Sequence, residues 1–267
     1  MKFVSRGAWW AASWAVVACS LNQNEPASAP GGGAGSAPGV QAASASNENG
    51  AYRELEVPGF LPAVLYLPAA REPRPLVVAS HGAGGVPEAE CDYWRRMTGG
   101  QAVLLCLRGT PLRNDGPSGY YYKTHLALGA ELRAALGALK ATFAARVASG
   151  SGVYAGFSQG AIMGAPIIPE HGDEFPTLAL IEGGYEYWSP ALARRFAERG
   201  GRRVLFSCGT AWCAKKARIP AEWLEARGVE VRIEYAEGAG HTAGGAVMKR
   251  TEDALPWLLA GDRNWSL

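Results

Sequence analysis

The sequence predicts an α/β fold in which helices flank a doubly wound, mostly parallel sheet. Short apolar runs alternate along the chain with longer stretches whose apolar residues recur at helical spacing. The short runs are nearly continuous in apolar residues, which is typical of parallel strands buried on both faces. No repeat of solenoid or propeller length is visible, so we expect one folded body.

The patterns predict strands and helices in regular alternation. The expected strands are residues 63–67, 76–79, 102–107, 152–157, 177–181, 203–207 and 229–235. The expected helices are residues 88–97, 124–147, 159–167, 191–199, 220–227 and 246–259. The helix over 124–147 is the clearest, because its leucines recur at spacings of three and four and form one apolar stripe.

The N-terminus has the layout of a secretory signal. Lys2 and Arg6 precede an apolar run over 7–18, which is too short for a membrane-spanning helix of ~20 residues. The run ends in VVAC, which resembles the bacterial lipobox. That resemblance implies a lipid on Cys19 and an exported protein anchored to the bacterial cell envelope, on the periplasmic face or the cell surface. The alternative is cleavage after Ala18, which leaves a free thiol.

Residues 19–50 contain mainly Ala, Ser, Gly, Pro and Asn and show no apolar periodicity. Such a segment cannot bury enough apolar surface to offset the entropy of ordering it. We therefore expect a signal peptide over 1–18, a lipidated cysteine with a flexible tether over 19–50, and a folded domain over 51–267. Membrane contact is expected through the N-terminal lipid alone.

Four cysteines remain after Cys19, an even number that suits an oxidising compartment. They allow three pairings, and we favour Cys91 with Cys106 and Cys208 with Cys213 because both pairs close short loops. Buried free thiols are the alternative.

Charge and motif content exclude several function classes. The chain has 26 Lys and Arg and 24 Asp and Glu, a formal charge of +2, without a block of either sign. We therefore expect no nucleic-acid partner. There is no glycine-rich phosphate loop with lysine, no HExxH and no CxxC pair, so neither a metal nor a cofactor is expected. The oligomeric state is left open.

The segment VYAGFSQGAIMG contains the strongest chemical motif. Ser158 lies between Gly156 and Gly160, after one expected strand and before one expected helix. A strand that turns sharply into a helix crowds the backbone, so flanking glycines let a serine project from the sheet edge as a nucleophile. The backbone N–H of Gln159 would then face a developing oxyanion. A purely structural glycine-rich turn is the alternative.

At AGFSQG the chain resembles the α/β-hydrolase superfamily, and within it the secreted carboxylesterase and dienelactone-hydrolase-like branch, from about residue 52 to the C-terminus. A second match is ASHGAGG, residues 79–85. The resemblance implies that the backbone N–H of Ala83 is the other oxyanion-hole donor, with Gly84 as the alternative. It also implies that His81 orients this loop.

His241 is the expected general base. It lies in EGAGHTAGG, after the last expected strand and before the last helix, which matches the family order of serine, acid and histidine. His125 heads a helix and His171 lies in a polar turn, where capping or solvated roles are expected.

The acid departs from the family pattern. Most members take it from the turn after the strand written RVLFS, but Ala211 and Trp212 stand there and the next carboxylate is Glu222. We expect Glu182 to be the acid, because it ends the preceding strand and so emerges at the same sheet edge as Ser158. Glu237, Glu186, a Ser-His dyad and an inactive relative are the alternatives.

The sequence thus predicts a serine hydrolase that cleaves small or extended carboxylic esters. Tyr120, Tyr121, Tyr122 and Trp188 could line the mouth and suit an apolar or aromatic acyl group. The segment between Glu182 and the next expected strand is too short for a large cap domain. A serine peptidase, or a non-catalytic lipoprotein that binds ligands with a degenerate triad, is the alternative.

Overall fold

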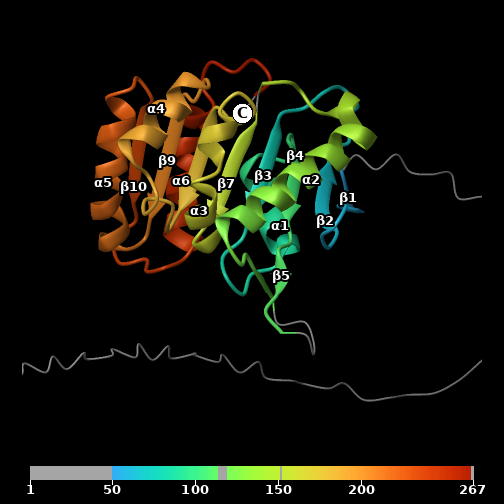
Figure 1. Ribbon diagram of the computed structural model, residues 1–267, viewed down its shortest axis with the longest axis horizontal. Helices are drawn as coiled ribbons and strands as arrows, with labels where there is room; N and C mark the ends of the chain where they lie inside the picture. The colour runs from blue at the N-terminus through green and yellow to red at the C-terminus, as the bar shows by residue number, and fades with distance from the viewer. Residues whose placement is uncertain (1–49, 114–118, 151, 266–267) are drawn as a thin grey trace, which may run out of the picture. The chain divides into compact units, whose positions relative to one another are not determined.

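The apolar runs of the chain pair into one eight-stranded sheet in the computed structural model, which describes residues 50–113, 119–150 and 152–265 (Figure 1). The expected signal, Cys19 and the tether up to residue 49 lie outside the described residues. Within the described part of the chain, no helix has the length and apolar character needed to cross a membrane.

The strand order is β1-β2-β4-β3-β7-β8-β9-β10. The strands β4, β3, β7, β8, β9 and β10 run parallel to one another. β2 is antiparallel to both β1 and β4. The strands are β1 (Ala51–Leu55), β2 (Ala63–Leu67), β3 (Leu76–Ser80), β4 (Val103–Leu107), β7 (Val153–Phe157), β8 (Thr177–Ile181), β9 (Arg203–Cys208) and β10 (Glu230–Tyr235). A separate two-stranded arm consists of β5 (Thr110–Pro111) and β6 (Tyr120–Tyr121).

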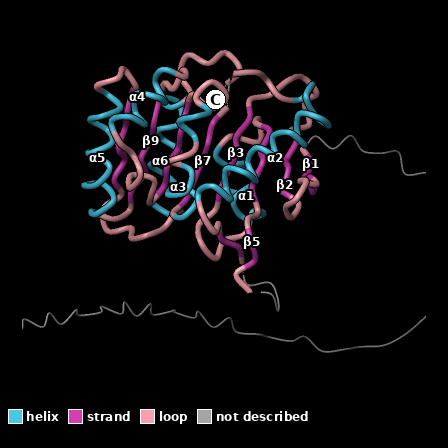
Figure 2. The backbone as a smooth tube through the Cα atoms, viewed as in Figure 1, coloured by secondary structure: helices cyan, strands magenta, loops and turns pink. Residues whose placement is uncertain are grey.

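Within the residues that the structure describes, α-helices cover the two faces of this sheet (Figure 2). They are α1 (Pro87–Met97), α2 (His125–Phe143), α3 (Gln159–Gly164), α4 (Pro190–Glu198), α5 (Ala211–Glu225) and α6 (Gly245–Leu258). Buried side chains of α1 and α6 pack in one apolar cluster, and those of α2, α3, α4 and α5 pack in the other. The predicted α/β class, with a mostly parallel sheet between two helical layers, is therefore confirmed. Between β8 and β9 the chain forms α4 alone, without a large cap.

Every expected strand is present, but β1 and the two-residue strands β5 and β6 were missed. Only Leu55 of the edge strand β1 is buried, so its sequence lacks the continuous apolar run of the central strands. Two expected helices end early: α2 stops at Phe143 and α3 stops at Gly164. Short 3-10 turns follow at Ala144–Arg146 and Ile168–His171, which explains why the helical pattern continues in the sequence.

The expected start of the helix at residue 220 is wrong, because α5 begins at Ala211 and passes through Pro220. Proline is favoured in the first turn of a helix, which made residue 220 look like a beginning. Thr210 is the actual N-cap, and its hydroxyl oxygen accepts a hydrogen bond from the Cys213 N–H at 3.2 Å.

Both favoured disulfides are formed. Cys91–Cys106 ties α1 to β4, and Cys208–Cys213 ties the end of β9 to the first turn of α5. The second bridge spans five residues and encloses the turn at Gly209 and Thr210.

Gly160→Ala should destabilise the protein, because a Cβ at this position would overlap the carbonyl oxygen of Ser80. We expect a loss of about 3 kcal/mol in the free energy of unfolding, measured by urea denaturation. Gly137→Ala in α2 is the control, because an added Cβ there has no atom within 4 Å. Its expected effect is a gain of roughly 0.5–1 kcal/mol. Equal stabilities for the two variants would contradict the packing described.

Candidate active site

The carboxyl ends of β7, β8 and β9 bring the expected site residues to one edge of the sheet. Ser158 directly follows β7 and Glu182 directly follows β8, and these two strands are parallel neighbours. His241 lies in the loop between β10 and α6. Ligands of open α/β sheets bind beyond this edge, so the topology alone makes it the place to examine.

Ser158 occupies a sharp turn between β7 and α3, with φ 47° and ψ −112°. A Cβ on Gly156 would lie 2.6 Å from the amide nitrogen of Ala161, so only glycine fits there. The Ser158 N–H donates to the carbonyl of Ile181 at 2.8 Å, which fixes the turn against the end of β8. The two flanking glycines therefore have the steric role that the sequence suggested.

The structure joins Ser158, His241 and Glu182 in one hydrogen-bonded chain. The distance from His241 Nε2 to Ser158 Oγ is 2.8 Å, and from His241 Nδ1 to Glu182 Oε2 it is 3.0 Å. With the proton on Nδ1, His241 donates to the carboxylate and its Nε2 accepts from the serine hydroxyl. This arrangement can take a proton from Ser158 and hold the resulting imidazolium beside an anion.

The Glu182 carboxylate is buried, at 3% exposure, and its remaining hydrogen bonds come from the turn after β9. Oε1 accepts from the N–H groups of Gly209 and Thr210, the latter at 2.9 Å. The Thr210 hydroxyl is 3.2 Å from Oε2 and can donate to it. A buried carboxylate needs such partners, and here the turn that lacks an acid of its own supplies them.

The alternative acids lie elsewhere. Glu237 and Glu186 are both exposed, and the carboxylate hydrogen-bonded to His241 is that of Glu182. The hydrogen bonds from the backbone N–H groups of Gly209 and Thr210 to Glu182 could not be predicted, because residue type alone does not show which backbone N–H faces the carboxylate. The only available signal was Thr210 as a helix N-cap.

Ser158 and Glu182 are also the two non-glycine residues with positive φ in the described part of the chain. Glu182 has φ 49°, and its N–H donates to the carbonyl of Ser207 at 2.9 Å. Such conformations cost of the order of 1–3 kcal/mol each and gather at functional sites. Backbone strain therefore points to the same pair of residues as the hydrogen bonds do.

The loop after β3 lies beside Ser158, since a Cβ on Gly82 would be 3.2 Å from the serine Cβ. The Gly84 N–H donates to the carbonyl of Tyr120 at 2.8 Å and is therefore engaged. The N–H groups of Ala83 and Gln159 have no hydrogen-bond acceptor among the described residues. Of the two alternatives for this loop, Ala83 is thus the available donor.

His81 is buried under the same loop. Its Nδ1 lies 2.7 Å from the carbonyl oxygen of Gly82, and its Nε2 lies 2.9 Å from that of Arg108. Burial lowers the pKa of this imidazole, which favours the neutral ring. The neutral His81 ring lies between the loop and the end of β4, and its single N–H can donate to one of these two carbonyl oxygens. The ring of His125 contacts Tyr187, and His171 lies near Glu174.

Two of the aromatic residues expected at the mouth belong to the core. Tyr122 is 2% exposed and donates its hydroxyl to the carbonyl of Leu107, and Trp188 is 5% exposed and packs on Phe196. Tyr120 and Tyr121 are half-buried in the arm formed by β5 and β6. Trp212 is 60% exposed, with the Lys216 ammonium 4.5 Å from its ring centroid.

A cavity of about 220 Å³ borders the candidate oxyanion loop and is lined in part by Ala83, Phe157 and Glu90. Glu90 accepts a hydrogen bond from the Trp94 indole N–H at 3.1 Å. Burial raises the pKa of the Glu90 carboxyl from about 4.5 to about 7. Glu90 could not be recognised from the sequence, because a single glutamate in an amphipathic helix has the same pattern as a glutamate exposed to solvent.

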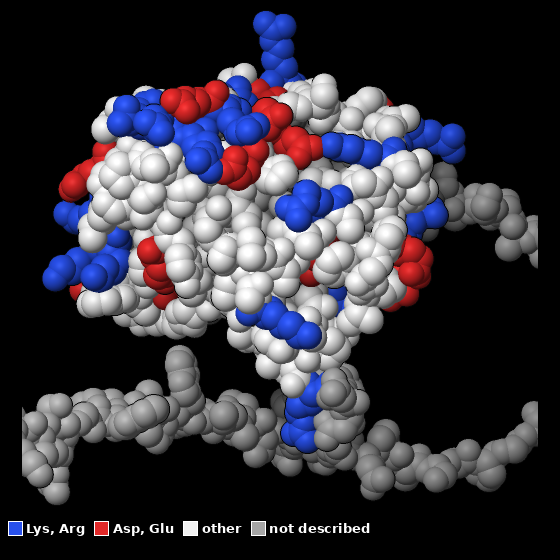
Figure 3. Space-filling view, viewed as in Figure 1, with Lys and Arg blue, Asp and Glu red and all other residues white. Residues whose placement is uncertain are grey.

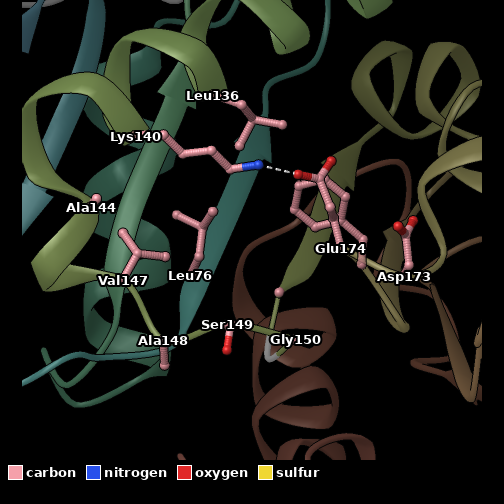
Figure 4. A pocket seen from close by; sticks show the side chains of 12 residues that line it. Leu76, Leu136, Lys140, Ala144, Val147, Ala148, Ser149, Gly150, Asp173 and Glu174 are labelled. Carbon is pink, nitrogen blue, oxygen red and sulfur yellow. Dashed lines mark hydrogen bonds and ion pairs between the residues drawn. The ribbon is translucent and has the colours of Figure 1, made fainter.

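Two other features do not belong to this site. A cavity of about 240 Å³ lies at the opposite, amino-terminal edge of the sheet, where Leu136 and Phe175 line it beside the Lys140–Glu174 ion pair (Figure 4). Near Glu182, the sulfur atoms of Cys208 and Cys213 come close to the carboxylate. Their disulfide leaves no thiolate to bind a metal ion.

Comparisons with known proteins establish the fold. A Thermus thermophilus protein, TT1662, is 18% identical, with a TM-score of 0.59 over 80% of this chain and 99% of that chain. A dienelactone hydrolase-like promiscuous phosphotriesterase from metagenomic libraries is 17% identical, with a TM-score of 0.59 over 79% and 98%. The Bacillus cereus carboxylesterase is 16% identical, with a TM-score of 0.54 over 72% and 91%. The shared fold is the α/β-hydrolase fold. No protein-family model and no curated protein matches the sequence.

The raised pKa of Glu90 predicts a pH-dependent stability. Because folding favours the protonated carboxyl, its contribution is full below pH 4.5 and is lost as the pH rises through about 7. We expect the free energy of unfolding to fall by about 2 kcal/mol more between pH 5 and pH 8 in the wild type than in Glu90→Gln. Urea denaturation at both pH values measures this difference. Glu237→Gln, at an exposed site, is the control, and identical pH profiles for Glu90→Gln and wild type would refute the assignment.

Proposed function

We propose that this protein is a serine hydrolase that cleaves carboxylic esters, with Ser158 as nucleophile, His241 as base and Glu182 as acid. The observation that carries the proposal is the continuous hydrogen-bonded chain from Glu182 through His241 to Ser158. A structural glycine-rich turn does not require a histidine and a buried carboxylate aligned behind its serine.

The reaction follows from this geometry. Ser158 Oγ attacks the ester carbonyl while His241 Nε2 takes its proton, and the N–H groups of Ala83 and Gln159 donate to the oxyanion. His241 then protonates the departing alkoxide, which leaves an acyl group on Ser158. A water molecule activated by the same imidazole releases the acid and restores the serine.

Glu182 acts through its charge and its fixed position. The Gly209 and Thr210 N–H groups hold the carboxylate, so it can accept from His241 Nδ1–H without reorganising. It thereby keeps the imidazole in the tautomer whose Nε2 can accept a proton. The hydrogen bond between Glu182 and His241 supports an enzyme over a non-catalytic binding module with a degenerate triad.

Ester bonds are favoured as substrates by the solved structures of similar fold, which include a carboxylesterase and a dienelactone hydrolase-like enzyme by their names. The proposal includes export and attachment to the bacterial cell envelope through a lipid on Cys19. Two disulfides support export, because such bonds persist in oxidising compartments.

A fluorophosphonate probe should label the wild-type protein covalently and fail to label Ser158→Ala. The probe reports a serine that is activated by a base, so labelling requires the hydrogen bond from Ser158 to His241. Ser149→Ala is the matched control, since this serine is exposed at the opposite edge of the sheet and should not affect labelling. A folded wild type that takes up no probe would favour a binding module over an enzyme.

Glu182→Gln should lower kcat on p-nitrophenyl acetate by about 100-fold or more, because a neutral amide cannot stabilise the imidazolium of His241. Glu237→Gln is the matched control, and we expect its kcat to stay within about twofold of wild type. Steady-state kinetics on both variants, with circular dichroism to verify folding, makes the comparison. Near-wild-type kcat in Glu182→Gln would mean that a Ser-His dyad suffices.

A further inference from the structure

The large apolar side chains that are exposed to solvent gather at one edge of the sheet. In the described part of the chain there are nine of them: Tyr52, Phe60, Leu61, Val86, Leu112, Leu126, Tyr187, Trp212 and Ile219. Seven of the nine, all except Tyr52 and Ile219, belong to segments at the carboxyl ends of the parallel strands. This is the edge that carries Ser158. We call these seven side chains the apolar rim.

Four members of the apolar rim lie on one side of Ser158. Phe60 and Leu61 are in the turn between β1 and β2, and the pairing of Val64 with Cys106 puts this turn beside the carboxyl end of β4. Val86 follows the loop after β3, and Leu112 follows β5. A Cβ on Gly84 would lie 3.7 Å from the Leu112 side chain, so Leu112 borders the candidate oxyanion loop.

The other three members lie in segments around the triad on the remaining sides. Tyr187 lies between β8 and α4, and Trp212 is in the first turn of α5, two residues after Thr210. Leu126 is in the first turn of α2 and is 70% exposed, the largest value among the nine. Because β7 stands between β3 and β8 in the sheet, the apolar rim flanks Ser158 on both sides.

The site flanked by the apolar rim is open. The His241 side chain is 55% exposed, and no large cap covers it in the part of the chain that the structure describes. One cavity of about 220 Å³ borders it beside Ala83, and another of about 400 Å³ lies beside Tyr185 and Trp212. A small dissolved ester would therefore touch few of the exposed apolar side chains, whereas an extended apolar surface could cover many of them at once.

The charged side chains are most crowded away from the apolar rim. On the face seen in Figure 3, Lys, Arg, Asp and Glu are most crowded at the upper left, whereas toward the β5–β6 arm the charged side chains are fewer and are Lys or Arg. Ion pairs such as Arg195–Glu170 and Arg194–Glu198 involve α4 and the turn that precedes β8. These ion pairs lie away from the apolar rim, although single charged groups border it, such as Lys216, whose ammonium is 4.5 Å from the Trp212 ring centroid.

We propose that the apolar rim binds the surface of an insoluble aliphatic polyester and so presents ester bonds to Ser158. This inference rests on the proposed function and names its substrate class. We favour an ester surface because the apolar rim flanks Ser158 on both sides. A surface that binds the rim therefore brings its ester bonds to Ser158. A second copy seated on the rim would cover Ser158 without supplying an ester bond, and the ester bonds of a phospholipid bilayer lie beneath charged headgroups, which an apolar rim would have to displace.

Binding can be measured without hydrolysis by using Ser158→Ala and dispersed poly(caprolactone) particles. We expect the protein to sediment with the particles, and the added pair Phe60→Ser and Leu126→Ser to weaken this binding by about tenfold or more. Tyr52→Ser is the matched control, because Tyr52 is exposed in β1 but lies outside the apolar rim, and it should bind as the parent does. In the Ser158 background, the same rim substitutions should leave kcat/KM on dissolved p-nitrophenyl acetate within about twofold.

The possible outcomes are distinguishable. Weaker particle binding with unchanged hydrolysis of the dissolved ester would support the inference. Equal particle binding by parent and rim variants would overturn it, and so would preferential binding to phosphatidylcholine vesicles or a rim-dependent dimer in analytical ultracentrifugation. If the wild-type protein does not hydrolyse the dissolved ester, this result would instead contradict the proposed function.

Discussion

The site depends on how one buried carboxylate is held. Glu182 is almost fully removed from solvent, and an ionised carboxylate in that position is tolerated only if its oxygens are hydrogen-bonded. Two backbone N–H groups, one hydroxyl and one imidazole provide those bonds. Removing any of these partners would leave the carboxylate less well solvated by the protein, so the acid, the turn at Gly209 and the orientation of His241 form one interdependent unit.

The position after β9, where the family resemblance would place an acid, is close to the end of β8, where Glu182 lies. β8 and β9 are parallel neighbours, which lie about 4.8 Å apart in a sheet. A side chain at the end of β8 can therefore reach toward the space above β9, and a glutamate is one methylene longer than an aspartate. The positive φ of Glu182 turns the chain at this point. The turn after β9 carries no carboxylate and contributes the backbone N–H groups of Gly209 and Thr210 to Glu182.

Much of this arrangement could be predicted from the sequence because it depends on side-chain type and strand order. Continuous apolar runs marked the central strands, and the glycines around Ser158 marked a turn with no room for a Cβ. Adjacent strand ends then made Glu182 the expected acid. Features that depend on the backbone were missed. Residue type does not show that the Gly209 and Thr210 N–H groups face Glu182. Edge strand β1 lacks a continuous apolar run, because only Leu55 is buried. The pKa of Glu90 depends on packing that appears only in three dimensions.

The Cys208–Cys213 bridge encloses the same two residues whose amides hold Glu182. The sheet and the serine turn can form by burial of apolar surface alone, but the shape of this small loop is fixed covalently only after the two sulfurs are oxidised. In the proposed mechanism, proton transfer is thereby linked to the oxidation of these two sulfurs. A chain kept under reducing conditions would have Ser158 in place before the orientation of His241 is secured.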